Sequence, residues 1–108
     1  MSGKPVVLRD RANRDVDDAV AYYLNENAVD AALGLVDALQ DAFALLGRHP
    51  AIGTSHYAYE LDIPGLRSWS LARFPYIVFY VERERDIDVW RVLHGRRDVP
   101  ALMREPSG

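Results

Sequence analysis

The chain has 108 residues, 49% of them hydrophobic, no cysteine and a formal net charge of −3. One core is sustainable at this length, so we expect a single domain over residues 1–108, without disulfides, thiolate catalysis or zinc sites built on cysteine. No segment has the roughly 20 apolar residues of a membrane span or the apolar stretch of a signal peptide, which predicts a cytoplasmic protein with no membrane partner.

The first predicted elements are a strand and two helices. The apolar, β-branched run KPVVLR predicts a strand over Lys4–Arg9. From residue 12 onward the apolar residues recur at helical spacing, and after the two asparagines of NENAVD the same spacing resumes until residue 46. This pattern predicts a helical hairpin, whose second helix we expect to end at Gly47 in the left-handed conformation, shortly before Pro50.

Several residues of the hairpin lie off its apolar stripe. The polar face of the first helix carries Arg14, Asp15, Asp17 and Asp18. In the second helix, Leu33 and Leu45 also fall outside the stripe. Two interpretations of these leucines remain open, since they are either ordinary surface leucines or a second apolar face for a partner.

The C-terminal half predicts three strands, in the runs LRSWSLAR, YIVFYVER and DIDVWRVLH. The middle run is apolar on both faces and should be an interior strand. The short charged segment ERERD predicts that the second and third strands pair antiparallel. The whole order predicts an α+β fold, β-α-α-β-β-β, with the helical hairpin packed on one face of a small, mainly antiparallel sheet.

Motifs for catalysis are few. The seven glycines form no phosphate-binding loop and the three histidines have no metal-binding spacing, so we expect no cofactor and no metal. Metal-free ribonuclease chemistry needs a base, a cation and an acid, for which His94, Arg73 and Glu60 are candidates. In the competing interpretation, His94 ends a buried strand and the arginines are solvated or face a partner.

Charge is unevenly distributed along the chain. Residues 1–65 contain five Lys and Arg against ten Asp and Glu, whereas residues 66–108 contain eight against six. The basic character therefore belongs to the C-terminal part, and the net negative charge argues against general nucleic-acid binding.

The segments AVAYYLNENAVDAALGLVDAL, LLGRHPAIG and GLRSWSLARFPYIVFYVERERDIDVWRVLHGRRD make the chain resemble the RelE/ParE superfamily of bacterial toxins. The resemblance covers about residues 5–100, which we expect to be the ordered core. It implies the toxin of a type II toxin–antitoxin system, neutralised in a hetero-oligomer by a cognate antitoxin that is ParD-like or another DNA-binding protein. RelE-like members are ribosome-dependent mRNA endonucleases, whereas ParE-like members poison DNA gyrase.

The chain looks more similar to the ParE-like branch. The RelE type of cleft is rich in lysine and arginine and has a tyrosine near the C-terminus, but here Lys4 is the only lysine and no tyrosine follows Tyr80. In a related nuclease subgroup an arginine is expected where Tyr76 stands. The resemblance thus implies a gyrase inhibitor that is not an enzyme and makes no direct specific contact with nucleic acid. The alternatives are a RelE-like mRNA endonuclease and a non-toxic protein-interaction domain with the same fold.

Two sets of site residues follow from this interpretation. We expect the ending VWRVLHGRRD to bind the target through Trp90, Arg91, His94, Arg96 and Arg97. We expect the antitoxin to contact Leu33, Leu45 and Trp69 and an exposed edge of the sheet, because off-stripe apolar residues and open edges are otherwise liabilities. Acidic patches on the antitoxin would suit the basic C-terminal part.

Overall fold

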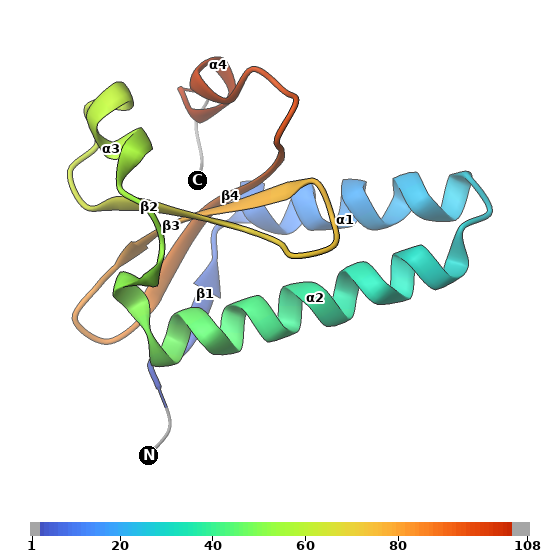
Figure 1. The fold of residues 1–108 in the computed structure, drawn as a ribbon, viewed down its shortest axis with the longest axis horizontal. Helices are drawn as coiled ribbons and strands as arrows, with labels where there is room; N and C mark the ends of the chain where they lie inside the picture. The colour runs from blue at the N-terminus through green and yellow to red at the C-terminus, as the bar shows by residue number, and fades with distance from the viewer. Residues whose placement is uncertain (1–2, 105–108) are drawn as a thin grey trace.

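The computed structural model describes residues 3–104 and confirms the predicted α+β order (Figure 1). Two long helices, α1 (Asp10–Asn25) and α2 (Val29–Arg48), follow the short strand β1 (Val6–Leu8). The other strands are β2 (Leu66–Ser70), β3 (Tyr76–Glu82) and β4 (Ile87–His94). Three short helical segments complete the structure: the 3-10 helix η1 (Pro50–Ile52), α3 (His56–Leu61) and α4 (Val99–Met103). None of the helices within residues 3–104 is both long and apolar enough to cross a membrane.

The strands form one sheet in the order β1-β4-β3-β2. Strand β3 lies in the interior, as its two apolar faces predict, and pairs antiparallel with both neighbours. Strand β1 pairs parallel with β4, so the first and last strands lie side by side. The outer edge of β2 is partly covered, because the backbone of Ser68 exchanges two hydrogen bonds of 3.0 Å with Thr54.

Helices cover both faces of the sheet. The helical hairpin packs on one face, where the small residues Ala12 and Ala19 lie buried on α1 and Leu35 and Leu39 lie buried on α2. Helices α3 and α4 lie over the opposite face, on a smaller apolar cluster built around Phe79 (Figure 1). The interior strand is therefore buried from both sides, which explains its continuous apolar sequence.

The predicted end of the second helix was wrong. Helix α2 continues to Arg48, and Gly47 does not adopt the left-handed conformation. Gly47 is required for a close approach instead, because a Cβ there would lie 2.5 Å from the carbonyl oxygen of Lys4. The same contact includes a hydrogen bond of 2.9 Å from the Lys4 N–H to the Gly47 carbonyl, which holds the chain before β1 against α2.

Candidate functional site

A β-bulge in β4 determines where the C-terminal polar side chains point. Phe79 of β3 pairs with Arg91, whereas the next residue of β3 pairs with Val89, which makes Trp90 an additional residue in β4. Strict alternation after Val89 would place Arg91 against the helical hairpin. The bulge shifts that alternation, so that Val92 packs in the hairpin core and Arg91 lies opposite Phe79.

Arg91 forms a buried ion pair with Asp15 of α1. Its Nε and Nη2 atoms donate to the two carboxylate oxygens at 2.7 and 2.9 Å, and its Nη1 donates to the carbonyl of Leu102 at 2.8 Å. The carboxylate also accepts the backbone N–H of Val92 at 3.0 Å. Because the two side chains are only 3% and 11% exposed, this charge-assisted pair connects α1, β4 and the α4 segment in the protein interior.

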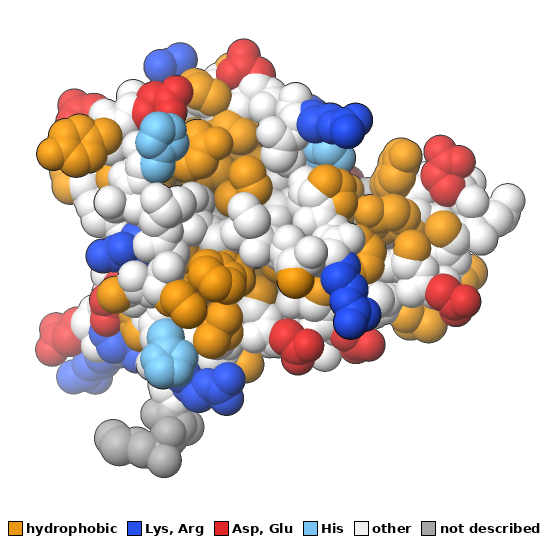
Figure 2. All heavy atoms as spheres, viewed as in Figure 1, with side chains coloured by type: hydrophobic (Ala, Val, Ile, Leu, Met, Phe, Trp, Pro, Cys, Tyr) orange, Lys and Arg blue, Asp and Glu red, His pale blue; other side chains and the backbone are white. Residues whose placement is uncertain are grey.

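A hollow of about 800 Å³ lies between α1, the end of β4 and α4, and we name it the strand-end cleft. Arg91 and Asp15 contribute to its floor. In the space-filling view, a basic side chain and a histidine lie together beside the segment between β4 and α4 (Figure 2). The cleft therefore combines positive charge with aromatic surface. Its aromatic and exposed basic lining residues are Tyr22, Tyr23, Tyr76, His94, Arg96 and Arg97.

Arg96 and Arg97 are exposed on a turn whose backbone is fixed by hydrogen bonds. The Gly95 N–H donates to the Pro75 carbonyl at 2.8 Å, which extends the pairing of β3 and β4 by one bond. The Arg96 N–H donates to Nδ1 of His94 at 3.1 Å, and the Arg97 N–H donates to the His94 carbonyl at 3.0 Å. Both guanidinium groups thus extend from an ordered support at the rim of the cleft.

The phenol of Tyr76, next to His94 in the cleft, stays protonated at neutral pH. Burial raises the pKa of Tyr76 above its ordinary value of 10.0, and the neighbouring Tyr23 and Tyr22 raise it further. The rings of Tyr76 and His94 meet edge to face with centroids 5.4 Å apart. A neutral phenol donates and accepts hydrogen bonds but is not a general base near pH 7.

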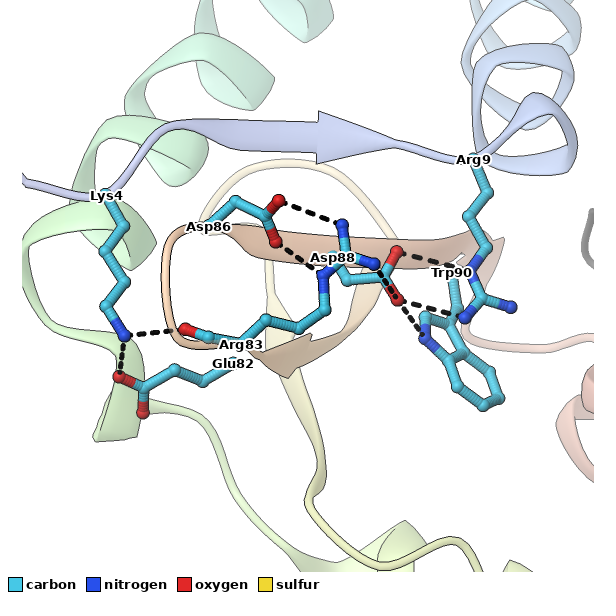
Figure 3. A network of polar contacts seen from close by, with 7 residues as sticks. All are labelled: Lys4, Arg9, Glu82, Arg83, Asp86, Asp88 and Trp90. Carbon is cyan, nitrogen blue, oxygen red and sulfur yellow. Dashed lines mark hydrogen bonds and ion pairs between the residues drawn. The ribbon is translucent and has the colours of Figure 1, made fainter.

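Trp90 lies apart from the cleft, in a polar network near the start of β4 (Figure 3). Its Nε1 donates to Oδ2 of Asp88 at 3.0 Å, and the guanidinium of Arg9 lies 4.1 Å from the centroid of its ring. Arg9 also donates to both Asp88 oxygens, at 3.2 and 2.9 Å. The structure therefore brings the other four predicted target-binding residues to the strand-end cleft and separates Trp90 from them.

The three residues of the ribonuclease alternative lie in different places. His94 lines the strand-end cleft, Arg73 lines a second hollow, and Glu60 lies on α3 with its carboxylate 3.4 Å from Nε2 of His56. Among residues 3–104, no three His, Asp or Glu side chains gather as metal ligands. What the cleft offers chemically is charge, hydrogen bonds and aromatic surface.

The second hollow, of about 600 Å³, lies between α2 and the segment formed by β2 and the loop after it, and we name it the α2 groove. It brings together Leu45 and Trp69, two of the predicted antitoxin contacts. Leu33 is 60% exposed and is not among the groove residues. The role of all three in antitoxin binding stays a prediction.

Sequence reasoning missed Asp15 as part of the site. We expected it on the solvent face of the first helix, yet it accepts the guanidinium of Arg91 in the interior. The run VWRVLH gives no clear signal of the bulge, because Trp90 and Val92 keep the alternation of a regular strand even though Val89 and Val92 lie three residues apart.

Comparisons with known proteins agree with this architecture. A family model described as the ParE toxin of the type II toxin–antitoxin system parDE matches residues 6–99. A solved structure described as the chromosomal ParDE TA system from P. aeruginosa contains a chain that is 18% identical, with a TM-score of 0.70 over 84% of this chain and 95% of that chain. At this identity the likeness concerns the fold. No curated protein matches the sequence.

Proposed function

The chain belongs to the family of ParE toxins of type II toxin–antitoxin systems, and from this premise we propose that it inhibits DNA gyrase by binding to it. A cognate antitoxin, either ParD-like or another DNA-binding protein, silences the toxin by direct binding in the bacterial cytoplasm. A solved ParDE structure with the same fold supports a hetero-oligomer with an antitoxin.

The observation that carries the gyrase proposal is the ordered turn at the rim of the strand-end cleft. Arg96 and Arg97 are exposed there while three hydrogen bonds fix their backbone. Arginine and tyrosine dominate the binding energy of protein interfaces, and a fixed support lowers the entropy lost when such side chains become immobile. The cleft is thus suited to holding a protein surface that carries negative charge.

Binding, without bond cleavage by the toxin, fits the arrangement of the polar groups. The guanidinium of Arg91 is bound to Asp15 and to a backbone carbonyl, which supports a structural role for this cation. His94 accepts a backbone N–H through Nδ1, and its aromatic neighbour Tyr76 is a neutral phenol. We therefore assign His94 to shaping the turn.

A supercoiling assay with purified toxin and purified gyrase tests this proposal. We expect the wild-type toxin to block supercoiling and to accumulate gyrase–DNA cleavage complexes. The double variant Arg96→Ala/Arg97→Ala should lose about tenfold or more in potency, because truncating an arginine that is a binding hot spot costs about 2 kcal/mol or more and about 1.4 kcal/mol is tenfold. The matched control is Arg48→Ala/Arg85→Ala, which removes two exposed arginines outside both hollows and should leave potency unchanged.

An mRNA endonuclease is the second candidate, because His94 shares the cleft with Arg96 and Arg97. It predicts codon-positioned cuts in mRNA on translating ribosomes and their disappearance in His94→Ala. Such cuts, with gyrase unaffected by the wild-type toxin, would contradict the gyrase proposal. If induced expression left bacterial growth unchanged, the chain would instead be a non-toxic interaction domain.

A further inference from the structure

The α2 groove has an apolar base and wall. Ala38 and Ala42 lie four residues apart on α2, and their small side chains leave a depression on the helix surface. Leu45 lines the same groove one turn further along. The opposite wall consists of Trp69 and Phe74, both only partly buried. A row of small residues at this spacing receives the side-chain ridge of a second helix, because ridges four residues apart interlock with such rows.

One rim of the groove is acidic. Asp30, Asp37 and Asp41 line it, all three are exposed, and none forms an ion pair within residues 3–104. The view of Figure 2 shows acidic side chains along α2. The groove includes a single cation, Arg73, against these three carboxylates. Asp37 and Asp41 stand one helical turn apart, where like charges repel and destabilise the helix. A partner with positive charge would relieve this repulsion.

We propose that the α2 groove binds a basic amphipathic helix of the antitoxin. Apolar side chains of that helix pack on Ala38, Ala42 and Trp69. Its Lys or Arg side chains lie opposite Asp37 and Asp41. This inference rests on the proposed function, since the occupant is the antitoxin. The three carboxylates lie at positions i, i+7 and i+11 on α2, so a helix running parallel to α2 carries its cations at the same spacing, and an antiparallel helix carries them at i, i+4 and i+11. The apolar anchors supply affinity, and the charges fix register and exclude other helices.

The proposal reverses the charge expected of the antitoxin from the sequence. The C-terminal part of the toxin is basic, which predicted acidic patches on the antitoxin. However, its exposed arginines Arg96 and Arg97 line the strand-end cleft, whereas Leu45 and Trp69, the predicted antitoxin contacts in the groove, lie beside carboxylates. The two partners are therefore recognised by surfaces of opposite sign.

The test uses the full-length toxin and the full-length product of the reading frame adjacent to its gene. Dissociation constants are measured by calorimetry for the wild type and for Asp37→Lys/Asp41→Lys, at low and at high salt. We expect the variant to bind about tenfold or more weakly at low salt, because it places like charges opposite each other across the interface. An antitoxin whose groove-facing Lys or Arg are changed to Glu should bind the variant better than it binds the wild type.

The matched control is Asp17→Lys/Glu84→Lys, which makes the same change in net charge at exposed positions outside both hollows. Equal antitoxin affinity of the two double variants would overturn the proposal, as would an acidic antitoxin helix in the groove. If Asp37→Lys/Asp41→Lys, measured without antitoxin, sedimented differently from the wild type while the control variant did not, the groove would be assigned to a second toxin copy. That result would also overturn the proposal. Gyrase inhibition is measured in parallel for the wild type and both variants without antitoxin. If the wild type did not inhibit gyrase, the proposed function would be refuted, whereas the result on antitoxin binding would stand.

Discussion

The strand-end cleft and the α2 groove both use the loop between β2 and β3 as a wall, yet they carry opposite charges and depend on different parts of the chain. The cleft combines α1 with β4 and α4, and a buried ion pair of residues 76 positions apart forms part of its floor. The acidic rim of the groove comes from α2 alone, where the regular spacing of one helix aligns the carboxylates. The cleft is therefore a product of long-range packing, and the groove rim is a local one.

The side chain of Phe74 packs between the two hollows. Its ring packs edge to face on Tyr23, which lines the cleft, with centroids 5.9 Å apart. On its other side it lies against α2, where a Cβ on Gly34 would come within 3.2 Å of the ring. The two hollows are thus separated by packed side chains, which allows substitutions in one to be tested without rebuilding the other.

Breaking the Arg91–Asp15 ion pair should have the largest effect of the variants considered. Its effect on the unfolding free energy should distinguish the strand-end cleft from the α2 groove. Arg91→Met leaves the Asp15 carboxylate buried without its cation, and removing one partner of a buried pair costs about 3–5 kcal/mol of unfolding free energy. Asp37→Asn in the groove should change the unfolding free energy by no more than about 0.5 kcal/mol, as is usual for exposed positions. Urea unfolding followed by circular dichroism measures both.

A double variant separates burial of charge from loss of packing. Arg91→Met/Asp15→Leu removes both charges, so we expect it to recover much of the stability lost in Arg91→Met, because buried pairs replaced by apolar groups are often neutral in stability. If Arg91→Met unfolded at the wild-type urea concentration, the ion pair would not support the cleft as described.

An intermediate effect is expected at the turn of the cleft. His94→Ala removes the acceptor of the Arg96 N–H and the edge-to-face contact with Tyr76. Loss of one hydrogen bond of this kind costs about 0.5–1.5 kcal/mol, which corresponds to a two- to tenfold loss of potency in the supercoiling assay. His94→Asn provides the control, since its side-chain oxygen can also accept the N–H and should retain more potency. A complete loss in both variants would indicate that the imidazole itself is needed.

The smallest effect concerns an ion pair that belongs to neither hollow, in the hairpin between β3 and β4. Arg83 donates to Asp86 at 2.6 and 2.9 Å (Figure 3), and this hydrogen bond lowers the pKa of Asp86 below its ordinary value of 3.8. Because the folded-state pKa is lowered, the contribution to stability is present above pH 3.8 and is lost as the pH falls through the folded-state value.

We therefore expect Asp86→Asn to be slightly less stable than the wild type at pH 7 and equal to it in strong acid. Thermal unfolding across this pH range measures the difference. The effect should be much smaller than that of Arg91→Met, because exposed ion pairs contribute little in water. A difference that grew toward low pH would contradict the assigned direction of the pKa shift.

The sequence predicted those parts of the fold that local patterns encode. The apolar stripe of Leu35 and Leu39 and the two apolar faces of β3 indicated the helical hairpin and the interior strand, and both are confirmed. The helix α3 has no counterpart in the prediction, because it spans six residues within a segment full of Gly and Pro. Short helices are stabilised by tertiary packing, here by Tyr57 on Phe79, and their sequences carry little signal of their own.

Local sequence patterns account for only part of the candidate site. His94, Arg96 and Arg97 line one cleft because they are neighbours in the sequence at the end of a strand, and their binding of a target stays a prediction. Trp90 was grouped with them although the bulge turns it toward Arg9 and Asp88. The pairing of Asp15 with Arg91 depends on how α1 lies across the sheet, and neither residue type nor spacing encodes that contact.

The parallel pairing of β1 with β4 determines how late during synthesis the sheet can be completed. The first strand to be synthesised pairs with the last one. The ion pair between Asp15 and Arg91 can form only after Arg91, 76 positions later, has been synthesised. At a synthesis rate of about 5–20 residues per second, this delay lasts about 4–15 s. Neither the cleft floor nor the completed sheet forms before translation has passed Arg91, so a nascent or truncated chain lacks the strand-end cleft.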